Sequence, residues 1–226
     1  MRLVFDGLER AIEIQAGRPV VLQVENQAFF SRLIQAMATQ EGRYAIEPYS
    51  VWNDESEIAP KMATLLISDV FDLPWGDRSL LGEVVKRMEK DLIDDEEARL
   101  DLEKVERLLA SRLMSLSAGL SADYTFGIEW DLGRSLKMLG FGVDAMPGYK
   151  LIDNLITFLS LALDSKCQKI LVFVNLKTFL TKNELKLFYE HVFYTGIHVV
   201  LFENKQDDNN YHHERKYTVD QDFLEY

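Results

Sequence analysis

The second half of the chain alternates helical and strand-like segments, and this alternation limits its fold more than any other feature. Residues 150–165 (KLIDNLITFLSLALDS) have the pattern of an apolar helix, 169–174 (KILVFV) of a strand, 181–196 (TKNELKLFYEHVFYTG) of a helix and 197–204 (IHVVLFEN) of a strand. Both strands are continuously apolar, as in strands that are buried on two faces. Strands that alternate with helices form parallel sheets. We therefore predict an α/β fold with a mainly parallel sheet covered on both faces.

The first part of the chain adds strands and one helix to this sheet. Apolar spacing predicts a helix over residues 27–40 (QAFFSRLIQAMATQ). Pro48 indicates that the strand around it lies at an edge or ends there. At the other end of the chain, residues 217–224 (YTVDQDFL) predict a last strand or a docked tail. The strands predicted in the first part are RLVF (2–5), AIEIQ (11–15), PVVLQVEN (19–26), YAIEPYS (44–50) and the apolar part of KMATLLISDVFDL (61–73).

A charged, helical block interrupts the sheet-forming segments. Its apolar residues form two stripes, which are rotated relative to each other by roughly 70–90° when projected on a helix. The stretch IDDEEA (93–98) between the stripes therefore predicts a bend or a break. We predict a head domain at residues 1–78 and 147–226, and a helical leg inserted at 79–146. The stripes are Leu81, Val84, Val85, Met88 and Leu92, and then Leu102, Val105, Leu109, Leu113 and Leu116.

The chain lacks the elements of a phosphate-binding loop. Such a loop would follow the strand VVLQV and needs glycines, a lysine and a hydroxyl group. The sequence instead continues ENQAFFSR (25–32), with two phenylalanines at the start of the helix. The later strand ILVFV ends on Asn175, an uncharged amide, where nucleotide-hydrolysing proteins often place an aspartate that holds Mg²⁺. We therefore predict that the protein is not an enzyme.

Composition limits the remaining classes of function. The formal net charge of −12 argues against wrapping nucleic acid over the whole surface, but it leaves room for a local basic lining. The single cysteine, Cys167, excludes an intrachain disulfide framework and favours a cytoplasmic location. No apolar run reaches the roughly 18–20 residues that span a bilayer. The polar stretch 204–216, with its HHE run, is predicted to be a solvated loop rather than a metal site.

Several stretches, taken in order, resemble a known family. They are PVVLQVENQAFFSRLIQ, LLISDVFDL, LGRSLKMLGFGVD, KILVFVNLKTFLTKNELKLFYEH with GIHVVLFEN, and YTVDQDFL. Together they resemble the small, ring-forming spacer-acquisition proteins of type II-A CRISPR systems. The resemblance covers most of the chain and is weakest between residues 80 and 127. It implies an α/β head related to nucleotide-binding folds, without nucleotide hydrolysis, and a helical leg inserted into that head.

The resemblance also implies ligands and partners. Members of the family form tetrameric rings that thread double-stranded DNA by its ends, and they act with the adaptation integrase and the effector nuclease. Calcium supports the ring, and the matching acidic residues in the loop SADYTFGIEWD are Asp123, Glu129 and Asp131. This loop is less acidic than the family pattern. The candidate DNA contacts are Lys86, Lys90, Lys137, Lys177, Lys182 and Lys186, each of which is alternatively a solvated surface lysine.

Two other functions compete with a DNA-binding ring. A protein-only scaffold that assembles through its leg would explain the net charge of −12. A degenerate nucleotide-binding α/β protein would explain the predicted fold. Binding to linear duplex DNA distinguishes the ring from the scaffold, and nucleotide turnover would support an enzyme.

Overall fold

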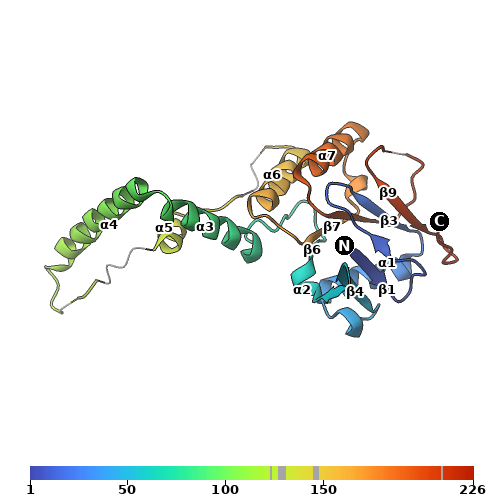
Figure 1. Ribbon diagram of the computed structural model, residues 1–226, viewed down its shortest axis with the longest axis horizontal. Coiled ribbons are helices and arrows are strands. Elements are labelled where there is room, and N and C mark those ends of the chain that lie inside the picture. Colours follow the sequence, from blue (N-terminus) through green and yellow to red (C-terminus); the bar gives the residue numbers. More distant parts are fainter. Residues whose placement is uncertain (123, 127–130, 145–147, 210) are drawn as a thin grey trace. The chain divides into compact units, whose positions relative to one another are not determined.

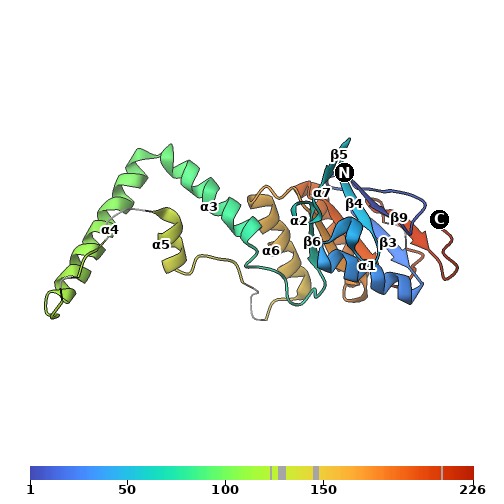
Figure 2. The same ribbon diagram turned by 90° about the horizontal axis from the view of Figure 1, so that it is seen from below.

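The computed structural model describes residues 1–122, 124–126, 131–144, 148–209 and 211–226 (Figures 1 and 2). The chain divides into two compact units. The first comprises Met1–Trp75 and Asp144–Tyr226 and is called the head. The second comprises Gly76–Val143 and is called the leg. The sequence placed the inserted leg at residues 79–146.

A five-stranded parallel sheet forms the centre of the head. Its strand order is β6 (Thr64–Ile67), β7 (Ile170–Val174), β8 (Val199–Glu203), β3 (Val20–Val24) and β9 (Arg215–Val219). Each neighbouring pair is parallel. The predicted α/β class with a mainly parallel sheet is therefore confirmed. The strands β3 and β8 are buried along their whole length, which explains why their sequences are almost continuously apolar.

Helices cover both faces of this sheet. On one face, Leu22 and Phe202 belong to a core that includes Phe29 of α1 (Gln27–Thr39). On the other face, the Phe173 ring meets the Phe188 ring of α7 edge to face, with centroids 5.6 Å apart. Figure 1 shows α6 (Leu151–Asp164) and α7 (Lys182–Thr195) on the side of the sheet opposite α1. Successive side chains of a strand point to opposite faces, so both layers are anchored by the same strands.

A smaller antiparallel sheet lies on the α1 side. Its strand order is β2 (Ile12–Glu13), β1 (Arg2–Phe5), β4 (Tyr49–Asn53) and β5 (Ser56–Ile58). The Phe5 ring lies 6.1 Å from the Phe202 ring, which joins this sheet to the parallel one.

The strand predicted at residues 44–50 is displaced in the structure. Residues Gly42–Tyr44 form a 3₁₀ turn, η1, and the strand β4 begins at Tyr49. Pro48 immediately precedes it and has no N–H to donate to a ladder. Its carbonyl instead accepts a hydrogen bond from the Asp6 amide at 2.9 Å. The short helix α2 (Pro60–Ala63) was not predicted.

Three helices form the described part of the leg. They are α3 (Arg78–Ile93), α4 (Glu96–Ser117) and α5 (Leu132–Met138). The break predicted within IDDEEA is confirmed, because α3 ends at Ile93 and the Asp95 carboxylate accepts a hydrogen bond from the Ala98 amide at 3.0 Å to start α4. All residues of α4 are described, and none of them is buried.

The remaining helix boundaries follow local signals. α7 begins with the predicted capping box, in which the Thr181 hydroxyl accepts from the Glu184 amide and the Glu184 carboxylate accepts from the Thr181 amide. The most apolar stretch, α6, has only 14 residues. Among the described residues, none of the helices combines the length and the apolar character needed to cross a membrane.

Candidate functional site

The carboxyl ends of the parallel strands are the natural place to look for a site, because open α/β sheets bind ligands there. At the end of β3, only Glu25 and Asn26 connect the strand to α1. The Asn26 carboxamide caps the helix by accepting a hydrogen bond from the Phe29 amide at 3.0 Å. The Phe29 side chain is buried. This connection is too short to form the loop that cradles a nucleotide phosphate.

The last residues of the chain cover the same junction. After β9 the chain reverses, and residues 220–226, here called the return segment, pack beside the end of β3. The Asn26 side chain donates to the Gln221 carbonyl at 3.2 Å, and the Gln221 side chain donates to the Glu25 carbonyl at 2.9 Å. The Phe223 ring lies 5.3 Å from the Phe29 ring. The return segment therefore packs against the junction of β3 and α1, where a phosphate loop would lie.

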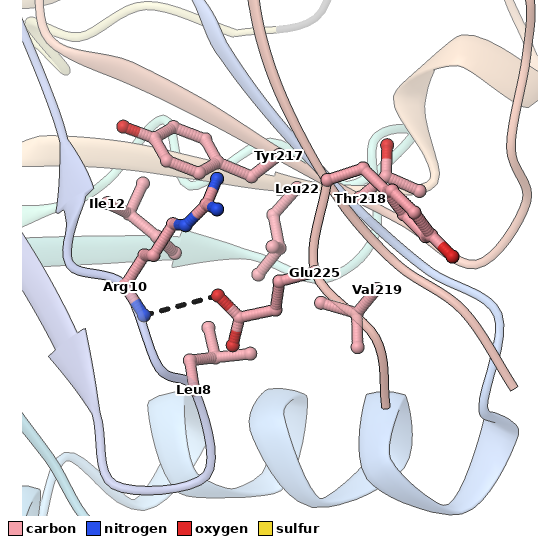
Figure 3. Close-up of a pocket in the computed structure, with 9 residues that line it drawn as sticks. Leu8, Arg10, Ile12, Leu22, Tyr217, Thr218, Val219 and Glu225 are labelled. Carbon is pink, nitrogen blue, oxygen red and sulfur yellow. Dashed lines mark hydrogen bonds between the residues drawn. The ribbon is translucent and has the colours of Figure 1, made fainter. Parts of the chain in front are cut away.

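A carboxylate fixes the far end of the return segment. Glu225 accepts hydrogen bonds from the backbone amides of Glu9 and Arg10, at 2.5 and 3.1 Å. Figure 3 shows this carboxylate reaching the N-terminal loop across a small pocket that is otherwise lined largely by apolar side chains. Residues 217–224, predicted to be a last strand or a docked tail, thus contribute to both: they include the end of β9 and the start of the return segment.

Asn175 ends β7, and its side chain forms part of the sheet edge. Its backbone amide donates to the Phe202 carbonyl at 2.7 Å, and its side-chain oxygen accepts from the Asn204 amide at 3.0 Å. Its φ angle is +54°, a conformation that asparagine adopts more readily than most residues. The amide therefore joins the ends of β7 and β8, which gives a structural reason for asparagine at this position.

Charged residues from the turn after β7, the loop between β8 and β9, and β9 itself form a largely buried network. The Lys177 ammonium lies 2.7 Å from Asp207 and 3.1 Å from Glu214. The Lys216 ammonium lies 3.0 Å from Asp207 and 3.2 Å from Glu214. Tyr189 donates its hydroxyl to Glu214 at 2.8 Å. Two lysines thus face two carboxylates, so the charges of these four side chains balance one another.

This network bears on two predictions, the contact of Lys177 with DNA and the solvated loop at residues 204–216. Lys177 was a candidate DNA contact, but its side chain is only 10% exposed and both its ionic partners lie inside the head. This placement argues against contact between Lys177 and DNA. Residues 204–216 were predicted to be a solvated loop. Glu214 is buried instead, and its carboxylate forms ion pairs with both lysines.

Two acids at this network have pKa values shifted in opposite directions. Burial raises the pKa of Glu203 to about 7, although the Lys177 amide donates to its carboxylate at 2.9 Å and works against the shift. Burial also acts to raise the pKa of Asp207. Hydrogen bonds from Lys177 and Lys216 outweigh that effect and lower the pKa of Asp207 to about 2. Asp207 therefore remains ionised, whereas Glu203 titrates near neutral pH.

The other candidate lysines lie at the surface. Lys86 and Lys90 are four residues apart on α3, and Lys182 and Lys186 are four apart on α7. Residues four apart on a helix lie on the same face, so each pair forms a small basic strip. Lys137 is exposed at the end of α5. Lys86 also pairs with Glu83 at 2.6 Å, and the ammonium of Lys186 is 3.9 Å from Glu190.

Of the three acids predicted to bind calcium, only Asp131 can be placed. Asp123 and Glu129 lie outside the described residues. Asp131 caps α5, and its carboxylate accepts a hydrogen bond from the Arg134 amide at 2.6 Å. An additional acid, Glu89 of α3, lies close by. A Cβ atom added to Gly133 would lie 3.5 Å from a carboxylate oxygen of both Asp131 and Glu89.

The carboxylates of Asp131 and Glu89 suit a hard cation, because calcium prefers carboxylate oxygens. Within the described residues, however, no group of three or more metal-ligating side chains comes together. No local signal selects Glu89, since only the packing of α3 beside α5 brings it near Asp131.

Comparison with known proteins identifies the family. Residues 48–223 match the family described as CRISPR-associated protein (Cas_Csn2). The chain belongs to this family. The matched region includes the whole leg and most of the head, but not β3. No curated protein matches the chain. The resemblance found in the sequence is therefore confirmed at the level of the family, and the protein is CRISPR-associated.

One solved structure supports the fold of this Cas_Csn2 protein. The crystal structure of Stu0660 of Streptococcus thermophilus matches with a TM-score of 0.57 and 14% identity, over 97% of this chain and 74% of that one. A putative ABC transporter ATP-binding protein from Pyrococcus furiosus has a TM-score of 0.39 and 10% identity, over 96% and 97%. At 14% identity, the match to Stu0660 bears on the fold alone.

Proposed function

We propose that this Cas_Csn2 protein is a non-enzymatic, homotetrameric ring that binds the ends of double-stranded DNA without sequence specificity. In this role it assists spacer acquisition in CRISPR adaptation, beside the adaptation integrase and the effector nuclease. The observation that carries the proposal is the family match over residues 48–223. The features of the head and of the leg described below support it.

Ring assembly is supported by the exposed apolar surface of the leg. In α4, Val105 is 65% exposed and Leu109 is 41% exposed. A cavity of about 430 Å³ lies along this surface between α4 and α5. Monomeric soluble proteins rarely expose a continuous apolar surface of this kind, so another copy of the chain is expected to cover it. The lining of this cavity includes Leu102, Val105, Leu109, Leu113, Leu132 and Met138.

The head supports a function without nucleotide hydrolysis. The return segment covers the junction of β3 and α1, and Asn175 bonds to the end of β8. We therefore expect no ATP turnover above a blank without protein. Turnover that is abolished by changing Asn175 or Arg32 would contradict this part of the proposal.

DNA binding through a basic channel is compatible with the net charge of −12, because the field inside a cavity depends on the residues that line it. Lys86, Lys90, Lys137, Lys182 and Lys186 remain the candidate contacts. Lysines that meet phosphates carry no base information, so binding should not depend on sequence. Replacing Lys86 and Lys90 together should weaken binding equally for all sequences and reduce its salt dependence.

Calcium is proposed to stabilise the assembly through Asp123, Glu129 and Asp131. Bound calcium would neutralise carboxylates that otherwise repel one another. At a calcium concentration of about 100 times Kd, the free energy of unfolding should rise by roughly 2.7 kcal/mol. Thermal melting with calcium or a chelator measures this rise. Asp131→Ala should reduce it, whereas Asp101→Ala, which changes an exposed acid on α4, should not.

A gel-shift assay with one plasmid tests the proposed function. The linearised form should bind, the covalently closed form should not, and calcium should strengthen binding. Equal binding of both forms would contradict threading. If neither form binds while the protein still assembles, the result favours a protein-only scaffold.

A further inference from the structure

Four residues of α4 form an exposed strip with a symmetrical order of charges. Asp101, Val105, Leu108 and Arg112 follow one another at intervals of four, three and four residues. At about 100° per residue, these intervals place all four on one side of the helix, and the strip is here called the seam. Val105 is 65% exposed and Leu108 is 61% exposed. The charged residues at the two ends of the seam are exposed as well.

The seam runs beside the cavity that α4 forms with α5, rather than inside it. Val105 borders that cavity, whereas Asp101, Leu108 and Arg112 lie outside its lining. The Asp101 carboxylate lies 2.8 Å from the Lys104 ammonium of the same helix, in an exposed ion pair of the kind that contributes little to stability. Between described residues of the leg, none of the ion pairs includes Arg112. The seam therefore presents apolar surface and charge that the described part of the leg does not use.

The order of these residues makes the seam complementary to a second copy of itself. The middle of the 22-residue helix lies halfway between Val105 and Leu108. It also lies halfway between Asp101 and Arg112. Two copies of α4 that run in opposite directions and overlap fully would therefore place Val105 opposite Leu108 of the second copy. They would also place Asp101 opposite Arg112 of the second copy, and the two-fold symmetry would produce each contact twice.

Other occupants fit the seam less well. Two parallel copies of α4 would place Asp101 against Asp101 and Arg112 against Arg112, and like charges across an interface repel each other. DNA phosphates would meet the Asp101 carboxylate and the four consecutive acids at residues 94–97. Antiparallel copies instead bring opposite charges together at both ends of the seam and overlap along about 33 Å of helix. Charge complementarity thus selects a second, antiparallel α4.

We propose that α4 pairs with α4 of a second copy of the chain in antiparallel orientation. Val105 and Leu108 form the apolar centre of this contact, and Asp101 and Arg112 form an ion pair at each end. The inference rests on the proposed assembly through the leg and specifies it, because it names the helix, the direction in which the two copies run and the residues that meet.

Reversal of charge in the full chain tests the ion pairs. Arg112→Asp should weaken association about tenfold or more, because each end of the seam would then bring two carboxylates together. Asp101→Arg should weaken it similarly, by bringing two guanidinium groups together. The two changes in one chain restore opposite charges and should recover most of the wild-type affinity. Sedimentation velocity over a range of protein concentrations measures the association.

Glu103 and Arg107 provide the matched control. They form an ion pair at 3.2 Å, and their positions place them on the side of α4 opposite the seam. Arg107→Asp changes the net charge as Arg112→Asp does, but it should associate as the wild-type protein does. Circular dichroism checks that every variant keeps its helices. Equal weakening by Arg107→Asp and Arg112→Asp, or no recovery in the double variant, would overturn the inference.

Disulfide formation tests the direction of pairing. Cys167→Ser first removes the single native cysteine. In this background, a mixture of the Asp101→Cys and Arg112→Cys variants should form crosslinked heterodimers, and the other Asp101–Arg112 contact remains in each pair. Neither variant should crosslink with itself, because the two positions 101 of antiparallel copies lie about 17 Å apart along the helix axis. Crosslinking of Asp101→Cys with itself would show parallel pairing and contradict the inference.

The outcomes also separate the inference from the proposed function. If the wild-type protein assembles and binds DNA ends but the mixture does not crosslink, the copies associate through another surface, and the inference alone is wrong. If the mixture crosslinks but the wild-type protein binds no DNA, the seam is supported and the proposed DNA-binding function is contradicted. Wild-type protein that remains monomeric at micromolar concentration would contradict both.

Discussion

The head and the leg use the same kind of apolar periodicity in opposite ways. In the head, strands such as β8 are buried along their whole length, and Phe202 is inaccessible to solvent. In the leg, the 22 residues of α4 carry a regular apolar stripe, yet none of them is buried. An apolar pattern therefore shows that a surface will be covered, but not by what. The head covers its own apolar residues, whereas the stripe of α4 stays exposed, and we propose that another copy of the chain covers it.

The largest expected effect concerns the core of the head. Phe202→Ala should lower the free energy of unfolding by about 3–5 kcal/mol, because it removes a fully buried ring and leaves a cavity. Denaturant unfolding followed by circular dichroism measures this loss. The corresponding truncation in the leg, Leu109→Ala, should leave the free energy of unfolding of the head unchanged. A comparable loss from both variants would show that the two regions do not differ.

The next effect concerns assembly through the leg. Val105→Asp combined with Leu109→Asp should weaken association at least hundredfold, or about 2.7 kcal/mol, because charges would enter an apolar interface. Sedimentation velocity should then show monomers, while the unfolding of the head remains as in wild type.

A matched variant separates the apolar stripe from the added charge. Ser111→Asp with Ser115→Asp adds the same charge to α4 away from the stripe, at exposed positions, and should still assemble. Monomers in the wild-type protein at micromolar concentration with calcium would contradict the account of the leg.

A third effect distinguishes the buried lysine from exposed ones. Lys177→Met should lower the free energy of unfolding by about 2 kcal/mol, because Asp207 and Glu214 would lose a charged partner. Solvent screens Asp207, which is 25% exposed, and this keeps the loss below that of a fully buried pair. Lys182→Met removes an exposed lysine and should leave the unfolding midpoint unchanged. If Lys177→Met is as stable as Lys182→Met and reduces DNA affinity, Lys177 contacts DNA after all.

The smallest effect is a dependence on pH. The pKa of Glu203 is raised to about 7, so the folded head holds a proton that the unfolded chain releases near its ordinary value of 4.5. The free energy of unfolding should therefore fall as pH rises above about 4.5, by roughly 1–2 kcal/mol between about pH 5.5 and 7. Glu203→Gln should flatten this part of the stability curve. An unchanged curve in the variant would assign the titration to another group.

The sequence predicted those elements whose pattern is local. β3, β7, β8 and the helices between them follow from apolar runs, helical spacing and the capping box at Thr181. The displacement of β4 has no local signal, because residues 44–50 have the pattern of one strand, although Gly42–Tyr44 form η1 and β4 begins only at Tyr49, after Pro48. Glu89 and Asp131 are brought together only by the packing of helices that are distant in the sequence.

The charge network shows the same limit for the candidate site. Lys177 lies in the turn after β7, and no neighbouring residue in the sequence distinguishes it from an exposed lysine. Its partners Asp207 and Glu214 lie 30 and 37 residues further along the chain. Neither the pairing nor the resulting burial has a local signal. Likewise, the stretch YTVDQDFL indicated a strand or a tail, but not that residues 220–226 would cover the end of β3.

The most direct test of the account is to close the DNA ends after binding. A linear duplex with biotin at both ends is mixed with the protein, streptavidin is added, and the salt concentration is then raised. Complexes formed before the ends are blocked should survive high salt, because a ring threaded on the duplex cannot slide off. No binding is expected when streptavidin is added first. Equal binding in both orders, lost equally at high salt, would contradict it.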